Sequence, residues 1–117
     1  MSEITRVRGH ARGRNSGSAA NGFAWAVATS QVATDDLYEQ THSTLARIDA
    51  ILARMNTDRT RAVTATVYIT DITQKQQMDR AWCEWVGDDP AHWPQRACVE
   101  AALHENDLVE VVLMVAL

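Results

Sequence analysis

The sequence predicts an α+β fold, in which a mixed β-sheet of about six strands is covered on one face by two helices. Two segments carry apolar residues at three- and four-residue steps, which is typical of amphipathic helices. Several shorter segments alternate apolar and polar residues or are continuously apolar, which is typical of strands. Two helices cover only one face of such a sheet, so we expect the other face to lie against a second subunit.

Length and composition predict a single domain that spans residues 1–117. Hydrophobic residues make up 46% of the chain and charged residues 22%, which is typical of a globular protein rather than a disordered one. Eleven basic and 15 acidic residues give a formal charge of -4. This balance argues against a large basic surface for nucleic acid.

The cysteines and the hydropathy pattern predict a soluble cytoplasmic protein without a membrane partner. Cys83 and Cys98 lack the spacing of a metal knuckle or a redox pair, and a reducing compartment is the simplest setting for them. The start of the chain has no apolar run that could serve as a secretory signal, and no segment reaches transmembrane length.

The first part of the chain predicts two strands and a long loop. Ile4–Arg8 alternates weakly, as a strand does, and Phe23–Thr29 is short and apolar, as a buried strand is. Between them, residues 9–22 are rich in Gly, Ser, Asn and Arg. That mixture predicts an exposed, mobile loop whose arginines are solvated.

A helix is predicted to begin near Asp36. Asp36 offers an N-cap, and Glu39 stands three residues later, as in a capping box. One apolar stripe about five turns long follows, and turn formers end it at residues 56–58. The stripe consists of Leu37, Thr41, Leu45, Ile48, Ile51, Leu52 and Met55.

A half-buried strand and a second helix are predicted next. Arg61–Thr70 alternates, with Val63, Ala65, Val67 and Ile69 predicted to share one face. Thr73 and Gln76 resemble a second capping box. Met78, Ala81, Trp82 and Trp85 then follow at helical spacing as packing anchors, until residues 87–90 end the helix.

The end of the chain predicts an antiparallel hairpin. Residues 93–103 and 108–116 are rich in strand formers, and four polar residues separate them. Arg96 and Glu110 are charges within these apolar runs, and charges are rarely buried without a partner. These two residues are therefore the first candidates for a functional site.

Register arithmetic separates the two charges within one hairpin. If Leu103 pairs with Leu108, then Glu110 lies opposite Ala101, about 17 Å from Arg96. Arg96 would then meet a carboxylate of a neighbouring subunit or an anionic ligand, for which its planar fork is suited. The alternative is a structural arginine paired with a nearby acid. Cys98 shares its face and is either a small buried hydrophobe or, beside that positive charge, a more acidic thiol.

Four stretches of the chain resemble the RidA/YjgF family of small enamine and imine deaminases, and its YoaB-like members in particular. The residues that carry the resemblance lie in 40–50 (Gln-Thr, then Leu-Ala-Arg-Ile-Asp-Ala), 65–71 (Ala-Thr-Val-Tyr-Ile-Thr-Asp), 94–100 (Pro-Gln-Arg-Ala-Cys-Val-Glu) and 109–111 (Val-Glu-Val). The Pro-x-Arg-x-Cys-Val-Glu segment with the later Val-Glu-Val is the most specific part.

This resemblance implies a chorismate-mutase-like fold assembled as a homotrimer, with clefts between neighbouring subunits. It implies that Arg96 binds the carboxylate of a small imine substrate and that Glu110 places the hydrolytic water. The implied reaction is the hydrolysis of 2-enamine or 2-imine acids to 2-keto acids and ammonia, with no metal or organic cofactor.

The chain departs from the family pattern at positions expected to bind substrate. Val27 and Ala28 stand where many members have Ser-Gly, and Asp79 stands where the family has asparagine. Trp93 directly precedes the Pro-x-Arg segment. Together with Trp25, Trp93 and Asp79 would suit a larger or cyclic imine-like substrate.

Two other functions are compatible with the same resemblance. One is a non-catalytic trimeric module that binds small carboxylates or keto acids. The other is an RNA-cleaving or translation-inhibiting protein, which the net negative charge argues against.

Overall fold

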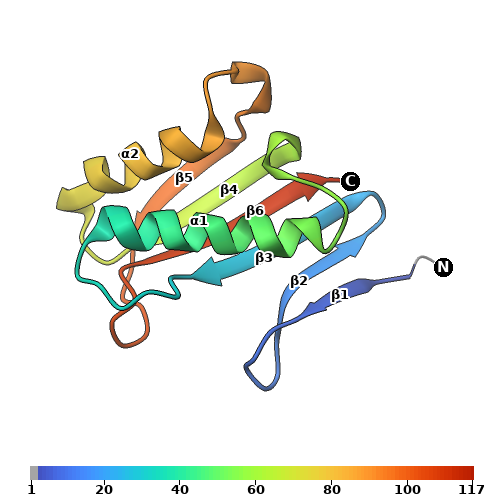
Figure 1. The fold of residues 1–117 in the computed structure, drawn as a ribbon, viewed down its shortest axis with the longest axis horizontal. Helices are drawn as coiled ribbons and strands as arrows, with labels where there is room; N and C mark the ends of the chain where they lie inside the picture. Colours follow the sequence, from blue (N-terminus) through green and yellow to red (C-terminus); the bar gives the residue numbers. More distant parts are fainter. Residues whose placement is uncertain (1–2) are drawn as a thin grey trace.

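The computed structural model describes residues 3–117, so Met1 and Ser2, at the start of the predicted domain, lie outside the described residues. One six-stranded mixed sheet carries both helices on the same face (Figure 1). The elements are β1 (Thr5–Arg8), β2 (Asn15–Ala20), β3 (Phe23–Thr29), α1 (Leu37–Ala53), β4 (Ala62–Ile69), α2 (Lys75–Val86), β5 (Gln95–Glu100) and β6 (Val109–Ala116). The predicted α+β class and two-helix layer are confirmed.

The strand order, β1-β2-β3-β6-β4-β5, contradicts the predicted hairpin between residues 93–103 and 108–116. β4 lies between β5 and β6, pairs with β5 in parallel and pairs with β6 antiparallel. The physical reason is the crossover through α2. After β4 the chain crosses the face of the sheet as α2 and re-enters the sheet as β5, beside β4 and in the same direction as β4. The predicted pairing of Leu103 with Leu108 is therefore wrong, and residues 101–103 lie beyond the end of β5.

The helix-covered face of the sheet holds the hydrophobic core. Alternate residues of the central strands are fully buried there, including Val67, Ile69, Val111 and Leu113. The predicted face of β4 is wrong at Val63, which is 39% exposed because the register shifts between Ala62 and Thr64. The apolar stripe of α1 is buried at every predicted position, from Leu37 to Met55.

The opposite face of the sheet remains apolar and uncovered within the described chain. Phe23, Trp25 and Val112 are each between 37% and 40% exposed on β3 and β6. Val99 on β5 is 42% exposed. Because large exposed hydrophobic patches mark interaction surfaces, this face supports the predicted contact with another subunit.

The helix ends confirm one predicted cap and correct another. Asp36 caps α1 by accepting from the backbone of Glu39 at 3.1 Å, although the Glu39 carboxylate binds the Thr34 hydroxyl instead of closing the predicted box. The predicted Thr73–Gln76 box does not form, because Thr73 bonds to Asp71 at the start of a 3-10 turn before α2. Neither helix is long and apolar enough to cross a membrane, as judged over residues 3–117.

The segment predicted as a loop over residues 9–22 contains strand β2. Its residues have low strand propensity, but β1 and β3 pair with it on both sides. Gly17 lets α1 lie close to this strand, since a Cβ there would stand 2.8 Å from the Ile51 side chain. Pairing with β1 and β3 and packing against α1 therefore make this segment a strand. The local composition carries no information about these tertiary interactions.

A buried amide, Gln40, joins α1 to two loops. Gln40 is 2% exposed, and its Nε2 donates to the carbonyl oxygens of Thr34 at 2.8 Å and Asn106 at 2.9 Å. Its Oε1 accepts from the backbone N–H of Leu108 at 2.9 Å. This one side chain therefore links the segment before α1 to the loop before β6.

We expect Gln40→Met to lower the free energy of unfolding by about 2–4 kcal/mol, because it leaves backbone groups buried without partners. The measurement is urea unfolding at a fixed protein concentration. Gln77→Met, at an exposed position of α2, is the matched control and should change stability by less than about 0.5 kcal/mol. Equal losses in the two variants would contradict this role for Gln40.

Candidate functional site

Arg96 lies on the helix-covered side of edge strand β5, against α2. Its Nη2 donates to Asp79 at 2.7 Å, and Lys75 binds the other oxygen of the same carboxylate at 2.8 Å. The guanidinium lies 5.2 Å from the Trp82 ring centroid, with Met78 sulfur 3.7 Å from Nη1. Arg96 therefore has a structural partner, Asp79, in its own chain, which is the alternative that the sequence left open.

Two groups beside Arg96 have shifted pKa values. Burial acts to raise the pKa of Asp79, but hydrogen bonds from Lys75 and Arg96 and their positive charges outweigh it, so the pKa falls below its usual range. For Cys98, burial outweighs the charges of Arg96 and Lys75, and the thiol pKa is raised. This direction favours the small-hydrophobe alternative for Cys98 over the more acidic thiol.

Glu110 lies in a pocket of about 670 Å³ on another part of the molecule. Val27 and Ala28, at the end of β3, line the same pocket, so the structure brings together three of the predicted site residues. Thr29 pairs with Glu110 across the β3–β6 ladder. The sequence missed the other lining residues, because they come from separate segments, namely two loops, β2, the end of β3 and α1. They are Gly9, His10, Ala11, Arg14, Asn15, Ser16, Thr29, Arg47, His104 and Asp107.

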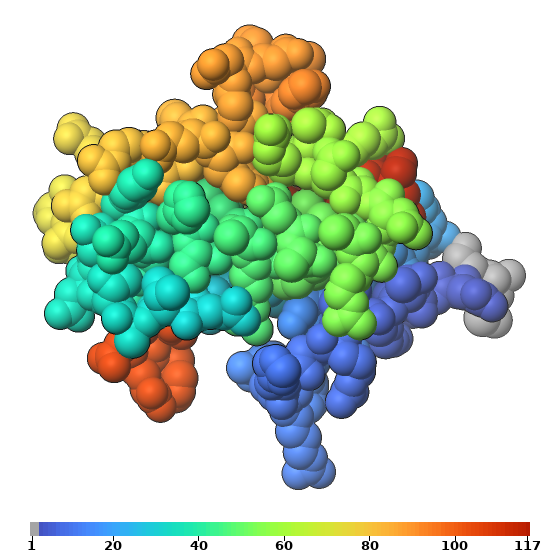
Figure 2. Space-filling view, viewed as in Figure 1, coloured from blue at the N-terminus to red at the C-terminus, as the bar shows by residue number. Residues whose placement is uncertain are grey.

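The Glu110 pocket appears in Figure 2 as the hollow between two projecting lobes. One lobe is the β1–β2 loop, coloured blue, and the other is the loop before β6, coloured orange-red. His10 and His104 stand exposed on these lobes. Asn15 lines the pocket and has a buried Oδ1 without a hydrogen-bond partner among the described residues.

Arg96 and Glu110 point to opposite faces of the sheet. Arg96 pairs with Ala65, whose side chain is buried under the helices, whereas Glu110 pairs with Tyr68 on the uncovered face. Three residues of β4 and two strand spacings separate them, which places their Cα atoms about 14 Å apart. One chain cannot bring the two charged groups to the same small molecule.

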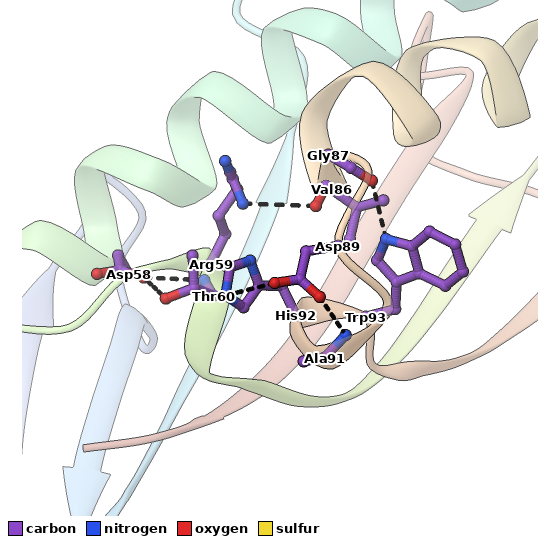
Figure 3. A network of polar contacts seen from close by, with 9 residues as sticks. All are labelled: Asp58, Arg59, Thr60, Val86, Gly87, Asp89, Ala91, His92 and Trp93. Carbon is purple, nitrogen blue, oxygen red and sulfur yellow. Dashed lines mark hydrogen bonds and ion pairs between the residues drawn. The ribbon is translucent and has the colours of Figure 1, made fainter.

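Trp93 lies at the end of the loop that follows α2, as Figure 3 shows. Its indole Nε1 donates to the carbonyl of Gly87 at 2.8 Å, and its side chain remains half exposed. Within residues 3–117, no hydrogen bond or ion pair joins Trp93 to Arg96. In the described part of the chain, Trp93 and the other aromatic candidate, Trp25 on the uncovered face, thus make no hydrogen bond to Arg96 and do not line the Glu110 pocket.

Metal ligation finds no support in the described part of the chain. Over residues 3–117, no three His, Cys, Asp or Glu side chains converge as metal ligands would. The chemistry available is that of a guanidinium, a carboxylate and the water that a polar pocket holds.

Residues 16–117 match a family model described as Endoribonuclease L-PSP. A RutC family protein of Haemophilus ducreyi is 43% identical over 101 residues, which cover 83% of each chain. The RutC family protein YoaB of Escherichia coli is 37% identical over 68 residues, or 58% of each chain. The crystal structure of a YjgF family protein from Neisseria meningitidis is 28% identical, with a TM-score of 0.88 over 97% of this chain and 94% of that one.

We expect iodoacetamide near pH 7 to alkylate Cys83 at least about tenfold faster than Cys98, because Cys83 is exposed and burial raises the Cys98 pKa. Mass spectrometry of peptides from a time course measures both rates. Cys83→Ser is the control that isolates Cys98. Equal or faster modification of Cys98 would contradict its description as a half-buried thiol with a raised pKa.

Proposed function

The chain belongs to the YjgF/RidA family, and on this premise we propose that it hydrolyses 2-imino acids, formed directly or from 2-enamine acids, to 2-keto acids and ammonia. The observation that carries the proposal is the Glu110 pocket. The half-buried Glu110 carboxylate lines this pocket together with Val27 and Ala28, and the pocket is large enough for a small organic acid and water.

In the proposed reaction, water adds to the carbon of the C=N bond. Glu110 orients this water and accepts its proton as the C–O bond forms. Glu110 passes this proton to nitrogen, which gives a neutral carbinolamine. The hydroxyl proton then moves to nitrogen, the C–N bond breaks as the C=O bond of the keto acid forms, and ammonia leaves. One water is consumed and one ammonia is released for each imine.

Arg96 is the proposed anchor for the substrate carboxylate. Asp79 accepts a hydrogen bond from Nη2 of Arg96 and so fixes the orientation of the guanidinium. The guanidinium has further N–H groups that can bind a second carboxylate. Because Arg96 and Glu110 face opposite sides of one sheet, we propose that each site uses Arg96 from one subunit and Glu110 from its neighbour. The apolar uncovered face supports such an assembly, for which the proposed form is a homotrimer.

The name of the family model also raises the RNA-cleaving alternative. The net charge of -4 gives it little electrostatic support, and the Glu110 pocket suits a small molecule. We therefore retain the deaminase as the proposed function.

The direct test generates 2-aminoacrylate in situ and follows its decay. We expect wild type to accelerate the decay and Arg96→Ala to lose about 10- to 100-fold in kcat/KM, since a hydrogen-bonded charge pair is removed. Arg61→Ala, at an exposed arginine, is the control and should retain activity. No acceleration by wild type would refute the proposal, and calorimetric binding of pyruvate without turnover would identify a binding module instead.

A second experiment tests the shared site by co-expressing Arg96→Ala and Glu110→Gln subunits that carry different tags. Each variant alone should have a strongly reduced activity. In random trimers with head-to-tail sites, about one quarter of the sites should carry both wild-type residues and regain activity. Purified mixed oligomers with no activity above the single variants would show that the two residues do not combine across subunits.

A further inference from the structure

A second cavity, of about 930 Å³, adjoins the Glu110 pocket. It lies between α1, the β1–β2 hairpin and the loop after β3. Four residues line both spaces, which places the two cavities side by side. They are Gly9, His10, Ser16 and Arg47.

The two cavities meet because the sheet parts between β2 and β3. These strands pair only from Gly17 opposite Ala26 to Ala20 opposite Phe23, whereas β3 continues through residues 27–29. A register shift between Val7 and Arg8 accompanies the opening on the other side of β2. In Figure 1 the β1–β2 loop accordingly swings away from the end of β3.

The lining of the second cavity combines an apolar wall with unpaired cations. Val7 and Ile51 are buried, and Ala46, Ala50 and Val32 also contribute. Arg8, Arg47 and Arg54 line it, against the single carboxylate of Glu39. None of the three arginines has a carboxylate within 4.0 Å in the part of the chain that the structure describes. The volume lies in the range of about 300–1,000 Å³ that is typical of small-molecule sites.

Arg47 is the arginine at the junction. It is the one arginine that lines both cavities, and it is half-buried on α1. An unpaired, half-buried guanidinium has lost part of its hydration and gains most from a bidentate carboxylate. An anionic group that extends past Glu110 into the second cavity meets this side chain.

We propose that the second cavity receives the substrate side chain and that the preferred substrates are 2-imino acids with an extended side chain ending in a carboxylate, which Arg47 binds. This inference rests on the proposed function, because it assigns the other end of the same substrate to Arg96 and Glu110. Arg47 is thus a specificity-determining residue rather than a catalytic one.

The test compares imines generated in situ from L-glutamate and from L-norleucine, which have side chains of similar length but different charge. We expect wild type to favour the glutamate-derived imine by about 10- to 100-fold in kcat/KM. Arg47→Met should reduce this preference to within about threefold, because the loss of kcat/KM on the glutamate-derived imine should exceed any loss on the norleucine-derived imine. Arg47→Lys should retain part of the preference, and Arg61→Met, outside both cavities, should retain all of it.

Equal wild-type rates on the two imines, or an equal loss on both in Arg47→Met, would overturn the inference and leave the proposed deaminase intact. A parallel calorimetric comparison of 2-oxoglutarate with 2-oxohexanoate separates the two claims. Arg47-dependent binding of 2-oxoglutarate without turnover of either imine would support the cavity and refute the deaminase. Equal binding of both keto acids, together with no turnover, would refute both.

Discussion

The buried carboxamide of Gln40 is the interaction on which the candidate site depends. Its amide group hydrogen-bonds to the backbone of Thr34, before α1, and to the backbone of Asn106 and Leu108, in the loop before β6. Asp107 and Glu110 follow on one side of this junction, and the end of β3 lies on the other. Because three hydrogen bonds converge on one side chain that is 2% exposed, the walls of the Glu110 pocket are joined far from solvent.

The strand order decides which residues can cooperate. α2 carries the chain from β4 to a parallel β5 at the sheet edge, and β6 then enters between β3 and β4. This arrangement places Arg96 under the helices and Glu110 on the uncovered face. If Arg96 and Glu110 act on one substrate, as proposed, a second copy must bring its own edge strand to the uncovered side. The fold therefore links the proposed chemistry to assembly.

Local patterns predicted α1, β4 and the buried stripe well, because each rests on periodicity over many residues. The predicted hairpin was wrong because it rested on a local signal, a short polar break between two strand-like runs. In the structure β4 lies between these two strands and pairs with both, which is a long-range interaction. The strand, helix, strand order of residues 61–100 carried a better signal, since such units favour parallel pairing. β2 and Gln40 could not be found locally, because neighbouring strands and distant carbonyl groups determine their roles.

The distribution of charge explains how a substrate anion would be kept away from the catalytic carboxylate. Around Arg96, two cations, Lys75 and Arg96, share one anion, Asp79, which leaves one positive charge for a ligand carboxylate. Around Glu110, the formal charges of Arg14, Arg47, Asp107 and Glu110 cancel, whereas in the adjoining cavity Arg47 stands with Arg8 and Arg54 against the single carboxylate of Glu39. A substrate carboxylate is attracted to the unbalanced cations on either side and not to the surroundings of Glu110. The Glu110 carboxylate can then face water and the imine carbon without repulsion from a second anion.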